Sequence, residues 1–225
     1  MKPAVFSALA LLATASFARS ATTLSFYVDL DVSGLSSAPA GPYFLDFQLT
    51  SSGNTVINTT TVSGFTFTGG SGAGAVGSST TYDNASGSLA GTVTLDNTGV
   101  LASELYQGFS GATTGIRFLV TTTLNEAAGV ADCFSVQILD SSVPTLNTIP
   151  TNAGDGLSLV KLSITQASAV ANVERYAAVG ASPVPTAVVS SAAVPEPSVY
   201  GLLGATAAGA AALARRRNRR SRLAA

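Results

Sequence analysis

The chain has 225 residues, with no histidine, no tryptophan and a single cysteine. Without histidine there is no imidazole general base, no Ser-His-Asp triad and no histidine-ligated metal site. The lone Cys133 excludes an intrachain disulfide, so packing must stabilise the fold. Because Cys133 falls within an apolar alternating stretch, we expect it to be a buried free thiol.

Basic residues are scarce in the body of the chain. Between positions 21 and 193, three basic residues stand against eleven acidic ones, a formal charge of −8. The net charge of the whole chain is only −1, because six of its eleven lysines and arginines lie within 215–222. Nucleic-acid binding needs clustered cations that displace counterions from phosphates, so the acidic body disfavours it, and we expect no nucleic-acid partner.

Apolar and polar residues alternate along most of residues 21–166. In the first run Leu24, Phe26, Val28 and Leu30 form the apolar set. The runs with this period are 24–30, 43–49, 65–67, 89–95, 116–124, 134–138 and 157–164. Segments rich in Gly, Asn, Asp, Ser and Pro separate them, including a low-complexity loop at 69–79. Short strands with this spacing predict an all-β fold, an antiparallel β-sandwich or jelly roll over 21–166.

Helical periodicity is weak, and its best candidates are residues 125–130 and 169–179. From 167 to 193 the composition shifts to Ala, Ser, Val and Pro. That composition predicts an extended, poorly packed linker after the sandwich.

The N-terminal segment has the features of a secretory signal. Lys2 precedes an uncharged, largely apolar stretch over residues 3–17, and small residues flank Arg19. We therefore expect residues 1–20 to be a signal peptide that signal peptidase removes.

Three parts follow one another within residues 194–222. The pentapeptide 194–198 contains Pro195, Glu196 and Pro197, and an uncharged apolar run of 16 residues, 199–214, comes next. As a helix this run reaches roughly 24 Å, against about 30 Å for a hydrocarbon core. The basic cluster over 215–222 includes Arg215, Arg216, Arg217, Arg219 and Arg220. Arginines in this place keep their end of a membrane helix in the cytoplasm, so the body is expected outside.

This order of parts resembles the PEP-CTERM sorting signal of Gram-negative bacteria that make exopolysaccharide. The resemblance implies that Pro195, Glu196 and Pro197 form a motif for an exosortase, a membrane transpeptidase. It further implies that 199–214 is the membrane helix and that the arginines are its cytoplasmic stop. The protein would be anchored in the inner membrane before processing and then reach the cell surface or extracellular matrix. The body is similar, through residues 43–49, 87–89 and 106–109, to small β-rich domains that precede this signal.

These observations favour an exported, non-enzymatic protein with a structural or interaction role. An alternative is a carbohydrate-binding module for exopolysaccharide, with sugars stacking on Tyr27, Tyr82 or Tyr106. A third interpretation is a glycoside hydrolase that uses Asp29 and Asp31, which share a strand face roughly 7 Å apart.

Acidic turn residues suggest calcium as a further alternative. Asp83, Asp96, Asp140 and Asp155 lie in or near turn segments, where oxygen ligands can gather. None of them has the spacing of a known calcium loop, so the sequence predicts no metal, cofactor or catalytic residue.

Overall fold

The computed structural model describes residues 22–37, 43–53, 56–125, 131–140, 147–179 and 185–192. The predicted signal peptide, residues 1–20, and the predicted sorting signal, residues 194–222, lie outside these ranges, as does nearly all of the helix candidate 125–130. Within the described ranges, no helix combines the length and the apolar character that a membrane crossing requires.

The described residues form strands and two short 3-10 helices. The strands are β1 (Thr23–Asp31), β2 (Tyr43–Thr50), β3 (Thr59–Gly69), β4 (Ala75–Tyr82), β5 (Ser86–Gly87), β6 (Val93–Asp96), β7 (Ala102–Phe109), β8 (Thr113–Thr123), β9 (Asp132–Asp140), β10 (Asn147–Thr148), β11 (Val160–Ile164), β12 (Glu174–Arg175) and β13 (Thr186–Ser191). The 3-10 helices are η1 (Ser33–Ser37) and η2 (Val170–Asn172).

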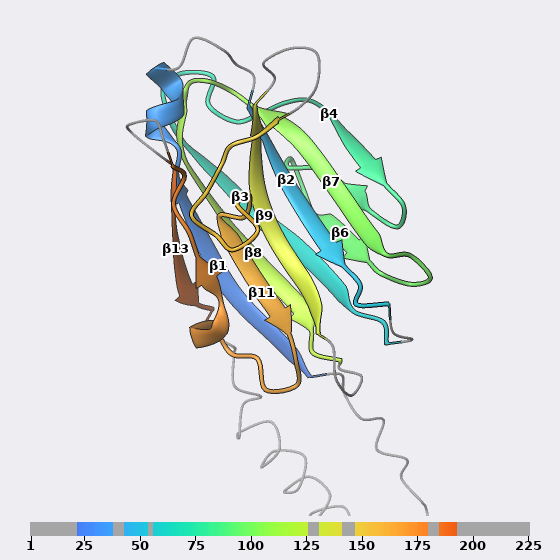
Figure 1. The fold of residues 1–225 in the computed structure, drawn as a ribbon. Coiled ribbons are helices and arrows are strands. Elements are labelled where there is room, and N and C mark those ends of the chain that lie inside the picture. The colour runs from blue at the N-terminus through green and yellow to red at the C-terminus, as the bar shows by residue number, and fades with distance from the viewer. Residues whose placement is uncertain are drawn as a thin grey trace, which may run out of the picture.

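The strands build two antiparallel sheets that pack face to face (Figure 1). The six-stranded sheet has the order β13-β1-β8-β3-β6-β5. The seven-stranded sheet has the order β12-β11-β9-β2-β7-β4, with β10 paired to β9. From β1 to β4 the chain changes sheet at every strand, and it does so again from β6 to β9. The predicted all-β antiparallel sandwich is thus confirmed.

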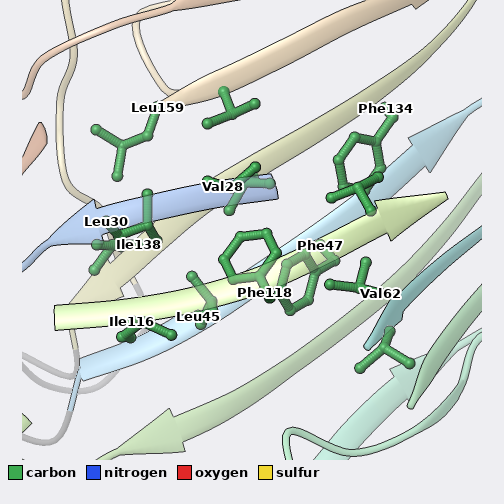
Figure 2. Packing of buried hydrophobic residues seen from close by; sticks show 14 of the residues in the cluster. Val28, Leu30, Leu45, Phe47, Val62, Ile116, Phe118, Phe134, Ile138 and Leu159 are labelled. Carbon is green, nitrogen blue, oxygen red and sulfur yellow. The ribbon is translucent and has the colours of Figure 1, made fainter. Parts of the chain in front are cut away.

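The core lies between the sheets and is made by the inward residues of each alternating strand. Val28 on β1 and Phe118 on β8 meet Leu45 and Phe47 on β2, and all four are fully buried (Figure 2). The rings of Phe47 and Phe118 are 5.4 Å apart and perpendicular, the edge-to-face arrangement that aromatic pairs prefer. Burial of each such side chain stabilises the fold by about 1.5–3 kcal/mol, without any disulfide.

The end of the described chain differs from the sequence-based prediction. The prediction of a poorly packed linker over 167–193 is wrong where β13 forms. This strand pairs with β1, with Thr186 opposite Asp31 and Ser191 opposite Phe26. Ala187 and Val189 pack against the core. The sandwich therefore extends well past residue 166, because the edge of β1 offers hydrogen-bonding groups that a nearby extended segment can satisfy.

The helix predicted over 169–179 is also wrong. Only η2 is helical there, and β12 follows it and pairs with β11. Val173 and Ala178 are buried without helical backbone. Edge pairing and burial outweigh a weak helical period in a segment this short.

The predicted loop at 69–79 is shorter than expected, because β4 begins at Ala75. Gly69 makes the turn out of β3 with a φ of +146°. A Cβ at this position would lie 2.0 Å from the carbonyl oxygen of Ala112, so only glycine allows the backbone to approach this closely.

Candidate functional site

Three aromatic side chains gather on the outer face of the seven-stranded sheet. Phe44 on β2 and Tyr106 on β7 have ring centroids 5.9 Å apart in an edge-to-face arrangement. The ring of Tyr82 on β4 lies 6.2 Å from that of Tyr106, and 51% of Tyr82 is exposed. A hydrogen bond with Tyr106 is the main cause that raises the pKa of the Tyr82 hydroxyl. We call Phe44, Tyr82 and Tyr106 the aromatic face.

The structure separates the three tyrosines that the sequence singles out. Tyr82 and Tyr106 belong to the aromatic face, whereas Tyr27 lies on β1 of the other sheet. There the guanidinium carbon of Arg117 sits 4.3 Å from the centre of the Tyr27 ring. A continuous line of all three tyrosines does not exist.

Two carboxyl groups adjoin the aromatic face. In the pairing of β2 with β7, Asp46 is opposite Tyr106 and Gln48 is opposite Glu104. Glu104 is also opposite Tyr82 across the β7–β4 pairing. Because paired residues point to the same side of a sheet, rings and carboxyl groups alternate over one patch.

Asp46 is buried without full hydrogen bonding. None of its surface is exposed, and its Oδ2 accepts a 2.8 Å hydrogen bond from Nε2 of Gln48. Its Oδ1 is buried and has no hydrogen-bond partner. Burial, and next the negative charge of Glu104, raise the pKa of Asp46 to about 8. Burial also raises the pKa of Glu104. Asp46 is therefore protonated at neutral pH, and a side-chain hydrogen bond with Glu104 favours this form.

No cation of the described residues neutralises this pair. The ion pairs within those residues join Arg117 to Asp29 at 3.0 Å and Lys161 to Asp155 at 3.1 Å. Lys161, on β11, is separated from Glu104 by β9 and β2, which corresponds to about 14 Å between strands β11 and β7. The patch thus combines one exposed and two half-buried rings with carboxyl groups that no cation neutralises.

The outer face of the six-stranded sheet is arranged differently. A groove of about 390 Å³ lies over β13, β1, β8 and β3, with Gly115 among its lining residues. Arg117 donates to both carboxylate oxygens of Asp29 at 3.0 Å. Asp31 accepts from the backbone N–H and the hydroxyl of Ser33, and these bonds lower its pKa. The two acids considered for glycoside hydrolysis thus share a face but already have partners.

The acids considered for calcium do not gather in the described part of the chain. No group of three or more Asp, Glu or Cys side chains there has the geometry to hold a metal ion. Asp96 accepts hydrogen bonds from Thr98 and Thr59. Asp155 accepts hydrogen bonds from Leu157, Ser158 and Lys161. Burial raises the pKa of Asp155, but these hydrogen bonds, above all those from Ser158, outweigh burial and lower the pKa.

A second buried carboxylate, Asp132, is fully hydrogen bonded. Its Oδ2 accepts from Nδ2 of Asn58 at 2.7 Å and from Nδ2 of Asn97 at 2.6 Å. Its Oδ1 accepts from the backbone N–H of Ser52 at 3.0 Å and from the Ser52 hydroxyl at 3.3 Å. Since Asp132 begins β9 while Asn58 precedes β3, the cluster ties the two sheets together at one end of the sandwich.

Cys133 is a free thiol, as expected, but it is only partly buried. It lies opposite Thr50 and Ser163 in the seven-stranded sheet. Burial is the main cause that raises its pKa, so the thiol stays protonated and unreactive at neutral pH.

The sequence analysis does not single out Phe44, Asp46, Gln48 or Glu104 as site residues. A signal for the first three exists, since they occupy the outward positions of the alternating run 43–49. Glu104 joins them only through strand register, which a single sequence does not reveal.

No protein-family model matches the chain, and neither the curated proteins nor the solved structures contain a match to it. The function is therefore argued from the geometry of the site.

Proposed function

We propose that the chain is an exported, non-enzymatic β-sandwich that binds polysaccharide of the cell surface or extracellular matrix through its aromatic face. The observation that carries this proposal is the grouping of Phe44, Tyr106 and the exposed Tyr82 beside Gln48 and Glu104. Aromatic rings present flat apolar surface to the C–H face of a sugar ring, while neighbouring amide and carboxylate oxygens accept from its hydroxyls.

The strand order supports a jelly roll as the finer fold class. The order β1-β8-β3-β6 in one sheet and β2-β7-β4 in the other arises because successive strands alternate between the sheets. Jelly rolls present broad sheet faces of the kind on which the aromatic face lies.

The aromatic face can be tested with two tyrosine substitutions and a matched control. We expect Tyr82→Ala and Tyr106→Ala each to weaken binding to a polysaccharide found on a glycan array by about tenfold, because exposed tyrosines at binding centres are typical hot spots. Tyr27→Ala, on the opposite sheet, serves as the control and should leave binding unchanged. An array without any bound glycan, or equal losses in all three variants, would contradict the proposal.

Delivery to the surface would depend on the C-terminal signal. Pro195 and Pro197 each fix φ and favour an extended residue before them, which presents Glu196 in a conformation that an enzyme can bind at low entropic cost. This supports recognition by an exosortase-type enzyme, with residues 199–214 as a transient anchor and the arginines of 215–222 as its cytoplasmic stop.

Processing can be tested by measuring the mass of the protein recovered from the cell surface. We expect a C-terminus near Pro197, and we expect this species to disappear when Pro195 and Pro197 are both replaced by alanine. Recovery of a stable cytosolic chain that retains its terminal arginines would contradict the sorting proposal without bearing on the aromatic face.

A further inference from the structure

We propose that the aromatic face recognises a polysaccharide with free amino groups, whose ammonium is held by the Glu104 carboxylate and the rings of Tyr82 and Tyr106. Partly deacetylated hexosamine polymers have this chemistry. The inference rests on the proposed function and names the class of its ligand.

The first argument is the pairing of rings with a carboxylate. Tyr82 is directly opposite Glu104 in the sheet, and Tyr106 is the next outward residue along β7. A cation near Glu104 therefore lies close to two electron-rich ring faces as well as to a negative charge. Aromatic ring faces attract ammonium groups, and proteins use them to bind ammonium ligands.

The second argument is the missing counter-charge. In the described residues neither Asp46 nor Glu104 takes part in an ion pair, although Glu104 is partly buried. Glu104 shares side-chain hydrogen bonds with Gln48 and Asp46, but a partly buried carboxylate without a cation is still unfavourable, and an arriving ammonium relieves that cost. A neutral N-acetylated sugar gives no such gain.

The third argument is the unpartnered oxygen of Asp46 beneath the patch. The residues that face Asp46 are Gln48 on its own strand, Glu104 and Tyr106 on β7, and Gln137 opposite it on β9, and none is cationic. Asp46 therefore holds a proton at neutral pH and can release it when a positive charge binds nearby. This coupling makes the affinity for a cationic ligand rise as the pH passes through about 8.

Charge at longer range favours the same ligand. Residues 21–193 contain eleven acids and three bases, so an anionic polysaccharide is repelled and a cationic one attracted. Arg175, the third base, is on β12, separated from β7 by three strands and about 19 Å across the sheet.

The decisive experiment compares two oligosaccharides that differ only in their amino groups. The purified full chain is titrated with a glucosamine hexasaccharide and with its fully N-acetylated counterpart at about pH 6, where the free amine is protonated. We expect the glucosamine oligomer to bind about fivefold or more tightly, the range for a partly desolvated charge contact with aromatic support. In Glu104→Gln the two affinities should become equal.

The outcomes separate this inference from the proposed function. Equal or tighter binding of the N-acetylated oligomer, still weakened by Tyr82→Ala, overturns amine recognition and retains polysaccharide binding. Loss of any dependence on Tyr82 and Tyr106 overturns both. A circular-dichroism melting curve for each variant confirms that it is folded before its affinity is compared.

A second measurement tests the coupling to Asp46. With an N,N,N-trimethylated glucosamine hexasaccharide, whose charge does not titrate, affinity should rise about threefold between about pH 6 and pH 9. In Asp46→Asn, which resembles the protonated acid, the affinity should not change over this range. A flat profile for the unmodified chain contradicts the role of Asp46.

Discussion

Two buried carboxylates of this sandwich, Asp46 and Asp132, have opposite environments. Asp132 accepts four hydrogen bonds, two from asparagine side chains and two from Ser52. Asp46 accepts one, from Gln48, and its second oxygen has none. Burial therefore does not by itself identify a structural residue, because only Asp132 is supplied with the donors that compensate the loss of water.

The difference separates a structural cluster from a binding candidate. The donors around Asp132 come from both sheets, so the carboxylate joins them. The unpartnered oxygen of Asp46 belongs instead to a residue opposite the half-buried Tyr106 and beside a second carboxyl group, that of Glu104. An unfavourable buried carboxyl group beside an aromatic patch is typical of a functional site.

The largest expected effect is at Asp132. Asp132→Ala leaves the amides of Asn58 and Asn97 and the N–H of Ser52 without their acceptor in a buried place. We expect a loss of about 3–4 kcal/mol in the free energy of unfolding, measured by urea denaturation. A loss below about 1 kcal/mol would mean that the cluster contributes little, and the contrast with Asp46 would fail.

Asp46→Asn should raise the free energy of unfolding, whereas Asp132→Ala should lower it. The native pKa of about 8 lies above the unfolded value of 3.8, so the native state binds the extra proton between these pH values. Stability therefore falls as the pH rises from about 4 to about 8, and the asparagine variant avoids this cost. The shift of about four pK units corresponds to about 5 kcal/mol, so we expect the variant to be more stable by several kcal/mol near pH 8 and equal near pH 4. Parallel pH profiles of the two proteins would falsify this expectation.

Asp155 provides an intermediate case with the reverse pH dependence. Its pKa is lowered, mainly by hydrogen bonds from Ser158 that overcome the effect of burial, and the side chain is 29% exposed. The hydrogen-bonded Asp155 carboxylate therefore stabilises the fold above the pKa of the unfolded state. This stabilisation is lost as the pH falls through the pKa of the native state. Asp155→Ala should cost about 1 kcal/mol at neutral pH, and less in acid, in thermal unfolding experiments. An undiminished cost at low pH would point to packing rather than charge.

The smallest effect is expected at the exposed pair of Arg117 and Asp29. Their side chains are 47% and 38% exposed, so solvent screens the attraction. A double-mutant cycle with Arg117→Met and Asp29→Asn should give a coupling energy of about 0.5 kcal/mol that decreases with added salt. A coupling as large as the effect at Asp132 would contradict the distinction between paired surface charges and buried ones.

Much of the fold could be predicted from local alternation. The runs 24–30 and 43–49 are indeed the centres of β1 and β2, because one sheet face is buried and the other is not. The pattern fails for β13, where Thr186–Ser191 reads as a small-residue linker and becomes a strand only through pairing with distant β1. Such pairing depends on tertiary context, which local propensity does not contain.

The candidate site was only partly predictable. Tyr82 and Tyr106 stand out by residue type, but their proximity follows from the β4–β7 register, which includes an irregularity between Val76 and Thr80. Alternation places Asp46 in water, whereas neighbouring side chains bury it completely. The extent to which side chains cover an outward position depends on three adjacent strands, and no single run reveals it.

The pairing of β13 with β1 has a mechanical consequence. Six residue pairs connect the two strands, and β13 is the last strand of the described chain. A load directed along β13 from its C-terminal end acts across hydrogen bonds that lie perpendicular to the strand. Such a load shears all six pairs together instead of opening them one by one, so the strand that ends the sandwich resists being pulled from it.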